Sequence, residues 1–280
     1  MILFKKAGEI NNYLSQQNKK GIQSGFVPTL GALHAGHLSL IEASKKKNDI
    51  TICSIFVNPT QFNDPADFEK YPVTIENDIY LLEKAGCDIV FLPSAEEIYP
   101  NGTHENFHYD LGYLENILEG KYRPGHFQGV CQVMDHLLKI ISPTNLYLGQ
   151  KDYQQCMVLK RLVEIINLKT NIIISPTLRE TDGLAMSSRN MRLSETERKQ
   201  AVSIFETLSL IKDELNPGNL DNLKQKAIDH LSSKGFKIDY IEIADAATLN
   251  TIENWDGSTK LVALCAAFLH EVRLIDNMLL

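Results

Sequence analysis

One stretch decides the fold of this chain: Pro28-Thr29-Leu30-Gly31-Ala32-Leu33-His34-Ala35-Gly36-His37. The apolar pair Phe26-Val27 precedes it, and a helical pattern begins after it at Leu38. This order predicts a β-strand, a tight glycine turn and a helix N-terminus that carries both histidines. Free backbone N–H groups and the positive end of the helix dipole favour anions there, and glycines let a ligand approach the backbone. The stretch therefore predicts a site for nucleotide phosphates; the alternative is a pair of structural histidines that cap the helix.

Composition limits the class of protein. The chain has 280 residues, enough for one large domain or two modest ones. Its 44% hydrophobic and 22% charged residues are ordinary for a soluble globular protein. The net charge of −7 and the lack of a Lys/Arg stripe argue against a nucleic-acid partner. No apolar run approaches ~20 residues, so we expect no membrane span, and the first residues do not resemble a signal peptide.

The cysteines indicate the compartment. The chain has five, an odd number, and they are widely scattered without a Cys-x-x-Cys pair. This usage is typical of free thiols in a reducing cytoplasm and does not indicate a zinc site.

The first two thirds of the chain alternate between two patterns. Short apolar runs rich in β-branched or aromatic residues predict strands at 25–30, 50–57, 88–92, 145–148 and 171–175. Helical patterns lie between several of them, at 38–47, 75–84, 130–141 and 152–166. Such alternation predicts an α/β, Rossmann-like domain with a mostly parallel sheet and with ligands outside the carboxyl ends of its strands.

The pattern changes after Pro176. The segment Ser194-Glu195-Thr196-Glu197 is a capping box that predicts a long helix to about residue 215, and a second helix follows Pro217-Gly218 to about residue 233. Strand patterns at 238–244, 261–268 and 272–275 close the chain. We therefore expect a Rossmann-like catalytic domain over residues 1–177 and a smaller α+β domain over residues 178–280.

Several further motifs accompany the opening stretch. In chain order they are Phe56-Val57-Asn58-Pro59-Thr60-Gln61-Phe62, Tyr71-Pro72, Arg123-Pro124-Gly125-His126-Phe127, Gly149-Gln150-Lys151-Asp152 with Gln154 and Gln155, and Met186-Ser187-Ser188-Arg189-Asn190. In order and spacing this set resembles the pantoate–β-alanine ligases, a family of the nucleotidyltransferase superfamily with the His-x-Gly-His signature. The resemblance extends over roughly residues 20 to 195, and the length of the chain suits the whole family.

The resemblance implies an ATP-dependent condensation of pantoate with β-alanine. Pantoate's carboxylate attacks the α-phosphorus of Mg²⁺-ATP, which gives pantoyl adenylate and pyrophosphate. The amine of β-alanine then displaces AMP and forms pantothenate. The resemblance also implies a homodimer, and a lid role for the C-terminal domain is our hypothesis.

Roles carry over residue by residue as implications of this resemblance. Catalysis falls to His34, His37, Lys151 and Arg189. Pantoate or β-alanine would contact Gln61, Gln155, Asn58, His126 and Tyr71, and Asp78 is the candidate for arranging Mg²⁺. ATP would contact Leu30, Gly31, Ala32, Leu33, His34, Ala35, Gly36, His37, Gly149, Gln150, Lys151, Asp152, Leu178, Met186, Ser187, Ser188 and Arg189.

Several of these residues also have a simpler structural interpretation, and the sequence departs from the family pattern at some positions. Lys151 and Asp152 could be a solvated pair at a helix start, Arg189 a surface arginine, and the glutamines buried structural amides. Gln150 stands where the family usually has glutamate, and Val73 and Asn77 also depart from the common pattern. Two other functions remain as alternatives: another adenylyltransferase of the superfamily, and a nucleotide-binding sensor without catalysis.

Overall fold

The computed structural model describes residues 1–62, 68–69, 71–103 and 107–280. The chain divides into two compact units: Met1–Gly149 with Gln155–Pro176, and Gln150–Gln154 with Thr177–Leu280. The second boundary lies one residue from the expected one at 177. The segment Gln150–Gln154, expected in the catalytic domain, groups with the C-terminal unit.

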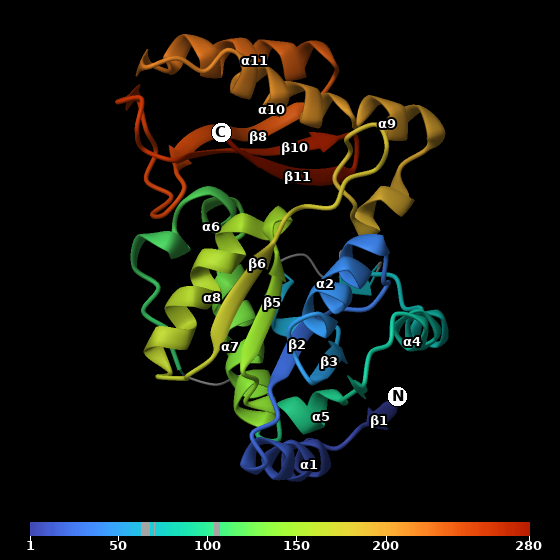
Figure 1. Cartoon of the computed structure of the whole chain (residues 1–280). Helices are drawn as coiled ribbons and strands as arrows, with labels where there is room; N and C mark the ends of the chain where they lie inside the picture. The colour runs from blue at the N-terminus through green and yellow to red at the C-terminus, as the bar shows by residue number, and fades with distance from the viewer. Residues whose placement is uncertain (63–67, 70, 104–106) are drawn as a thin grey trace. The chain divides into compact units, whose positions relative to one another are not determined.

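The first unit is built on a six-stranded, fully parallel sheet. The strand order is β1-β4-β3-β2-β5-β6 (Figure 1), with β1 Ile2–Phe4, β2 Ser24–Thr29, β3 Ile50–Ile55, β4 Ile89–Phe91, β5 Asn145–Gly149 and β6 Asn171–Ser175. This confirms the predicted α/β class. The order reverses at β2, which lies between β3 and β5, and ligands of open α/β sheets bind at such a point.

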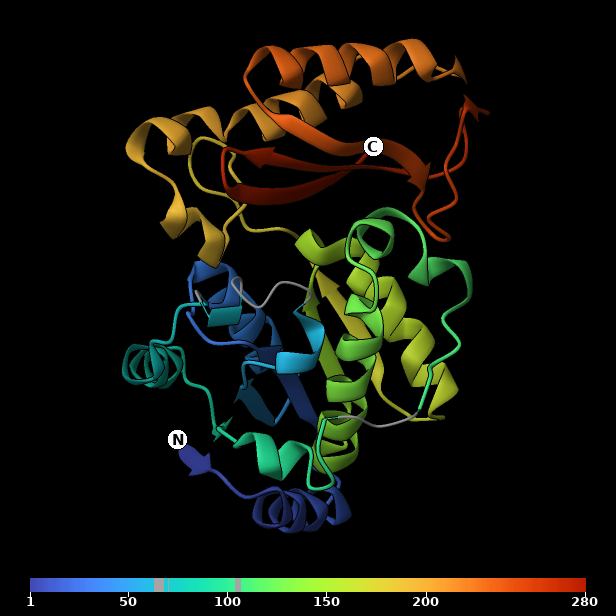
Figure 2. The same cartoon turned by 180° about the vertical axis from the view of Figure 1, so that it is seen from behind.

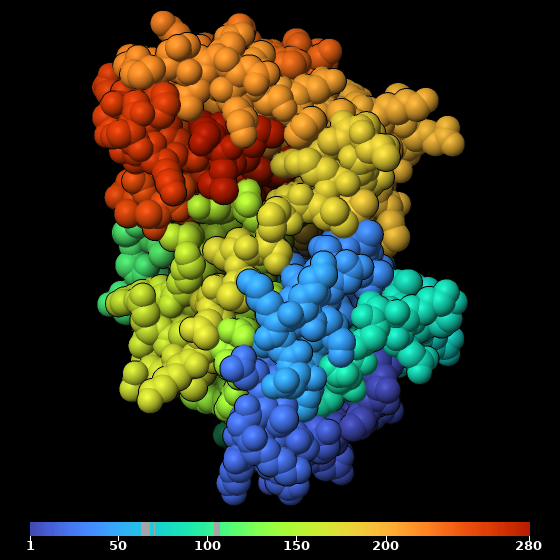
Figure 3. All heavy atoms as spheres, in the orientation of Figure 1, coloured from blue at the N-terminus to red at the C-terminus, as the bar shows by residue number. Residues whose placement is uncertain are grey.

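Helices cover both faces of this sheet because its strands are apolar on both sides. Phe26 packs in one core with α1 (Ala7–Lys19), α7 (His126–Ile141) and α8 (Tyr153–Ile165), whereas Val27 packs in a second core with α2 (Ala35–Lys45) and α4 (Ile75–Lys84). Figure 1 shows α2 on the near face, and Figure 2 shows α7 on the opposite face. Only Asp78 and Leu82 of α4 are buried, and Figure 3 shows the teal atoms of α4 at the surface of the unit.

Short elements connect these layers: η1 Pro59–Gln61, α5 Ala95–Ile98, η2 Gly112–Glu115, α6 Leu118–Tyr122 and η3 Gln150–Asp152. The predicted helix at 75–84 coincides with α4. Two others begin earlier than predicted, α2 at Ala35 and α7 at His126. Gly125, with a φ of 79°, is the N-cap of α7, a left-handed conformation that favours glycine.

The second unit has an antiparallel sheet in the order β11-β10-β8, formed by β8 Lys237–Asp245, β10 Leu261–Leu269 and β11 Val272–Leu279. Its apolar core joins this sheet to α10 (Ser203–Asp213) and α11 (Asp221–Ser233). A two-stranded ribbon, β7 Gly218–Asn219 with β9 Asn254–Trp255, and the turn η4 Ser188–Arg192 complete the unit. The expected α+β organisation is confirmed.

The single long helix predicted over residues 195–215 is wrong. The capping box at Ser194 and Glu197 is present and opens α9 (Glu195–Gln200), but the helix is interrupted before α10. The N–H of Ile204 donates to Ala201 O at 3.2 Å, a bond three residues long instead of four. This tighter turn separates the two helices.

Within the described ranges, no helix combines the length and the apolar character needed to cross a membrane. His104, a histidine without a motif, lies outside those ranges.

Candidate active site

The two motif histidines close the N-terminus of α2 around each other. His34 is the N-cap, and its Nδ1 accepts a hydrogen bond from the Gly36 N–H at 3.1 Å. Its own N–H donates to Nδ1 of His37 at 3.4 Å, and the two ring centroids are 4.1 Å apart. Because each Nδ1 accepts, a neutral ring carries its proton on Nε2. The two histidines therefore cap the helix, as the alternative interpretation predicts. The same hydrogen bonds place an Nε2–H donor on each neutral imidazole.

The turn before this helix is held by a buried carboxylate. The Ala32 and Leu33 N–H groups donate to Asp78 at 2.9 and 2.8 Å, and the Thr74 hydroxyl donates to it at 3.0 Å. Gly31 and Ala32 have φ values of 86° and 50°, and a Cβ on Gly31 would lie 3.1 Å from Asp78. The turn is thus strained at Ala32 and depends on Asp78 for its shape.

These contacts bear on the expected role of Asp78 toward Mg²⁺. Asp78 is fully buried, and both of its oxygens accept backbone hydrogen bonds. Across the described residues, no three His, Cys, Asp or Glu side chains are grouped so that they could hold a metal ion. The residues around Asp78 do not fit a protein-held Mg²⁺ site, since Mg²⁺ keeps near-octahedral geometry with waters and accessible oxygens.

A pocket of about 140 Å³ lies beside this turn, at the carboxyl ends of β2, β3 and β4. Gly31 and Asp78 contribute to its wall, and most of its other lining residues are apolar, among them Leu30, Phe56 and Leu92.

A second cluster fixes Gln61 at the end of η1. Asn58 Nδ2 donates to Gln61 Oε1 at 3.1 Å and to Gly129 O at 3.1 Å. Asn58 Oδ1 accepts from the Thr60 N–H and hydroxyl and from the Tyr99 hydroxyl, the last at 2.7 Å. Asn58 is fully buried. Its amide therefore serves protein groups, and we assign it to positioning Gln61 instead of contacting substrate.

His126 holds the same segment from α7. Its Nδ1 is 2.7 Å from Gln61 O and donates to it, while its Nε2 accepts from Arg123 Nη1 at 3.1 Å. Tyr71 lies in the same unit, with its ring 5.8 Å from that of Phe62. The structure thus brings His126 together with Asn58 and Gln61, from two widely separated motifs.

Two residues of this cluster were missed by sequence reasoning. A Cβ on Gly129 would lie only 2.1 Å from Thr60 O, so glycine is required for α7 to approach η1. Tyr99 is buried at 3% exposure and bonds Asn58. Gly129 within a helical pattern was the available signal for close packing, whereas nothing local distinguishes Tyr99.

Of the remaining predicted ATP residues, Gly149 ends β5 in the first unit and the others lie in the second, where the turns η3 and η4 contact β11. Lys151 is 3.7 Å from Asp152 and only 15% exposed. The carbonyls of Gln150 and Lys151 both accept from Asn277 Nδ2, at 2.9 and 2.8 Å. Gln154 is buried on the same segment, and Gln155, half-buried, begins the part of α8 that groups with the first unit.

The carboxylate of Asp276, in β11, holds the segment 178–189 through Arg179. Arg179 forms a bidentate pair with Asp276, at 2.6 and 3.1 Å, and stacks 4.8 Å from the Phe205 ring. Burial raises the pKa of the Asp276 carboxyl, and the Arg179 guanidinium opposes this shift. Arg179 pairs with Ala185, so that Leu178 and Met186 are joined by a backbone hydrogen bond of 3.0 Å. Ser187 caps η4 by accepting from the Arg189 N–H.

Comparison with known proteins decides the family. A model of the pantoate-beta-alanine ligase family matches residues 2–279. The chain belongs to this family. A pantothenate synthetase from Cytophaga hutchinsonii is 43% identical, with 100% of this chain and 99% of that protein covered. One from Fervidobacterium nodosum is also 43% identical, with the same coverage of 100% and 99%.

Solved structures agree with the family. A pantothenate synthetase from Thermus thermophilus superposes with a TM-score of 0.90 at 35% identity, with 99% of each chain covered. A pantoate-beta-alanine ligase from Francisella tularensis, complexed with beta-gamma ATP and beta-alanine, has a TM-score of 0.81 at 41% identity. It covers 100% of this chain and 97% of its own. The ligase family therefore extends over both units.

Proposed function

We propose that this ligase joins pantoate to β-alanine in two steps that use one ATP. The proposal rests on family membership over residues 2–279 and on the ATP and β-alanine bound by the Francisella relative. Within this chain, the proposal is supported above all by the capped pair His34 and His37, which places two Nε2–H donors at one helix N-terminus.

In the first step a carboxylate oxygen of pantoate attacks the α-phosphorus of ATP. A new O–P bond forms, the bond to the β-phosphate bridging oxygen breaks, and pyrophosphate leaves with the electron pair. The nucleophile has no proton to lose, so the barrier is lowered by positioning and by donors aimed at the phosphates. The family resemblance assigns acid/base chemistry to His37; we expect its Nε2–H to act chiefly as such a donor.

In the second step the neutral amine of β-alanine attacks the acyl carbon of pantoyl adenylate. The C–N bond forms, the bond between the acyl carbon and the phosphate oxygen breaks, AMP leaves with that electron pair, and the proton of the amine passes to water. Water competes for the same carbon, so exclusion of solvent protects the adenylate. This is the chemical reason for our hypothesis that the C-terminal unit acts as a lid.

The family resemblance implies which side chains would serve these steps. Gln61 has its Oε1 engaged by Asn58, which orients its Nε2–H₂ group as the donor toward a pantoate oxygen. Gln155, His126 and Tyr71 complete the proposed acid and amine pocket. Lys151 and Arg189 would contact phosphates as cations, with Ser187, Ser188 and backbone groups around them, and Asp152 would accept from the ribose.

Magnesium would accompany ATP and neutralise charge on its phosphates. The contacts of Asp78 support no protein-held site for the ion. We further propose a homodimer, on the family resemblance, and a cytoplasmic location, which the five buried cysteine thiols support. Sedimentation velocity of the purified chain tests the dimer.

Pyrophosphate release tests the function. With Mg²⁺, ATP and pantoate we expect a burst near one equivalent per chain, and sustained turnover with AMP only after β-alanine is added. His37→Ala should lower the rate of adenylation by about 10²–10³-fold, the usual effect of losing one preorganised donor. ATP binding without pyrophosphate release would identify a sensor, and release that needs another acceptor would identify a different adenylyltransferase; both outcomes would overturn the proposal.

A further inference from the structure

Both polar atoms of the Asn277 side chain, in β11, form hydrogen bonds with the turn η3. Its Nδ2 donates to the carbonyls of Gln150 and Lys151, at 2.9 and 2.8 Å, and its Oδ1 accepts from Gln150 Nε2 at 3.2 Å. The side chain is buried, with 1% of the residue exposed. Three hydrogen bonds therefore fix the turn η3 to the sheet of the second unit.

The backbone of Asn277 is itself held rigidly. Its N–H donates to Asp276 Oδ1 at 2.8 Å, and its carbonyl accepts from Arg179 Nη2 at 3.1 Å. Arg179 also donates to Asp276 and to Gly183 O. A bidentate ion pair and a strand thus set the position from which Asn277 reaches η3.

The same two strand residues anchor the other cationic segment. Arg179 pairs with Ala185, and Asn190 Nδ2 donates to Ala185 O at 3.0 Å. Asn190 lies in η4, which also contains Arg189. Both η3 and η4 contact β11. Lys151 and Arg189 are therefore carried by turns attached to one strand.

We propose that Asn277 is a positioning residue for Lys151, and that it makes Lys151 part of the same rigid body as Ser187–Arg189. The grouping of Gln150–Gln154 with the C-terminal unit supports this. The proposal rests on the proposed function, because it takes Lys151 as a phosphate contact. Any motion of the C-terminal unit would then move both cations together.

Only an amide meets the needs of this position. Two carbonyls require donors and Gln150 Nε2 requires an acceptor, so a single Asn satisfies all three groups. Aspartate keeps the size but offers only acceptors to the carbonyls. Alanine leaves three polar groups of the turn without this partner. Either change should release η3 while the rest of β11 retains its ladder.

The experiment compares Asn277→Ala and Asn277→Asp with the wild type in the pyrophosphate assay. We expect kcat for adenylation to fall by about tenfold or more in both, as misplacing a charged group does. The KM for pantoate should change by less than about twofold, because Gln61 lies in the other unit. A wild-type kcat in Asn277→Asp would overturn the proposal.

A double-mutant cycle with Lys151→Ala separates positioning from general damage. If Asn277 acts through Lys151, adding Asn277→Ala to Lys151→Ala should lower kcat by less than about twofold more. Fully additive losses would show that Asn277 does not act through Lys151. Failure of the wild type to release pyrophosphate would instead refute the proposed function, so the two failures are distinguishable.

Asp239→Asn is the matched control. It breaks the 2.7 Å ion pair of Asp239 with Arg273, between β8 and β11 of the same sheet, without touching η3. We expect a lower Tm and an unchanged kcat. If Asn277→Ala does not fold, Gln150→Ala, which removes one of the three bonds, should still lower kcat by about two- to fivefold. Equal kcat effects of the control and the Asn277 variants would contradict a positioning role.

Discussion

At the scale of single residues, the amide of Asn58 organises the hydrogen-bonded cluster around Gln61. Its oxygen accepts from Thr60 and Tyr99, and its nitrogen donates to Gln61 and Gly129. Because every polar atom of the side chain is engaged in a dry environment, each bond restricts the others. The Tyr99 hydroxyl belongs to this network through its hydrogen bond to Asn58.

Tyr99→Phe tests whether this network sets pantoate affinity. The change removes only the hydroxyl that donates to Asn58 at 2.7 Å. A buried hydrogen bond contributes about 0.5–1.5 kcal/mol, so we expect the KM for pantoate to rise by roughly two- to tenfold while the KM for ATP stays within about twofold. Steady-state kinetics with each substrate varied in turn provides the measurement.

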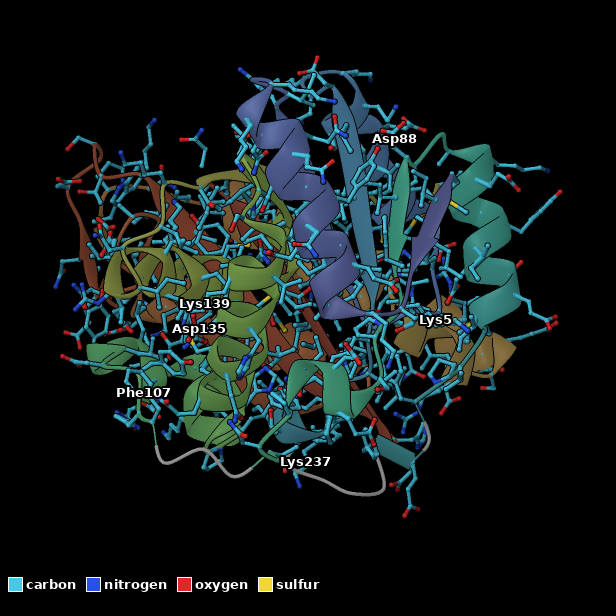
Figure 4. The ribbon with its side chains drawn as sticks, turned by 90° about the horizontal axis from the view of Figure 1, so that it is seen from below. Lys5, Asp88, Phe107, Asp135, Lys139 and Lys237 are labelled. Atoms are coloured by element: carbon cyan, nitrogen blue, oxygen red, sulfur yellow. The ribbon has the colours of Figure 1, made fainter. Side chains whose placement is uncertain are left out.

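Tyr109→Phe is the control for loss of a buried hydroxyl. Tyr109 is as buried as Tyr99, at 3% exposure, and donates to Asp135 at 2.9 Å. Asp135 also accepts from Lys139 at 2.9 Å, and Figure 4 shows this pair together on α7. We expect a similar loss of Tm and no change in either KM. An equal rise of the pantoate KM in both variants would contradict the role of Tyr99.

The sequence pointed to Asn58, Gln61 and His126 as candidate site residues. It did not indicate which of them would contact substrate and which would position another side chain. Asn58 and Gln61 differ little as sequence signals. Burial and hydrogen bonding separate them, because Asn58 is fully buried and donates to Gln61, whose contact with substrate is our proposal. Tyr99 lies 41 positions from Asn58 and shares no motif with it. The two side chains meet only through tertiary packing, so no local pattern could indicate the contact.

At the scale of elements, α2 and α4 are coupled through Asp78. The carboxylate belongs to the first turn of α4, yet it accepts from the two amides that lead into α2. Gly31 and Ala32 both have positive φ, a conformation that alanine adopts only when its surroundings impose it. The orientation of His34 therefore depends on a residue of another helix.

Asp78→Asn should weaken ATP binding without changing the demand for magnesium. Asn offers one acceptor to two amides, so one buried N–H loses its partner at a cost of about 1–3 kcal/mol. We expect a higher KM for ATP and an unchanged Mg²⁺ concentration for half-maximal rate. Titrating Mg²⁺ at saturating ATP provides the measurement. A markedly raised Mg²⁺ requirement would identify Asp78 as a magnesium ligand instead.

Thr74→Val is a milder variant for comparison with Asp78→Asn. It removes the hydroxyl that donates to Asp78 at 3.0 Å but leaves both amide contacts. A smaller rise in the ATP KM than that of Asp78→Asn is expected.

Elements with strong local signals were predictable, and those set by context were not. The apolar spacing of α4 gave both of its boundaries, whereas the capping box of α9 gave only the start of that helix. β1 was missed because three residues at the chain start carry no alternation, and it exists only by pairing with β4. The interruption at Ala201 has no Gly or Pro to mark it, since it arises from a shifted backbone bond.

At the scale of the whole molecule, each unit buries its own core. The core residues of the second unit, such as Leu208 and Ile241, form a cluster that shares no member with the two clusters of the first. Sequence patterns indicated two domains and placed Gln150–Gln154 in the first, between β5 and α8, whereas its contacts group that segment with the second unit. Its attachment depends on Asn277, more than 120 positions later.

The buried thiols provide a test of how independently the two cores unfold. All five cysteines are buried, Cys265 in the second unit and Cys53, Cys87, Cys131 and Cys156 in the first. Burial raises the pKa of Cys87 to about 12 and raises the pKa of Cys53 and Cys265 as well. Because the thiolate is the reactive form, the native protein should resist iodoacetamide at pH 8.

The raised thiol pKa values also determine the direction in which stability changes with pH. The folded-state pKa of Cys87 lies above the ordinary value of 9.0, so its contribution to stability is complete below that value and falls as the pH rises toward 12. In a urea titration at pH 8, read by mass spectrometry of the alkylated peptides, Cys265 should lose protection at a different urea concentration from the four thiols of the first unit. Separate transitions follow if each core melts alone, because an apolar cluster is the cooperative element of a domain. Coincident labelling of all five thiols would show instead that the two units unfold as one.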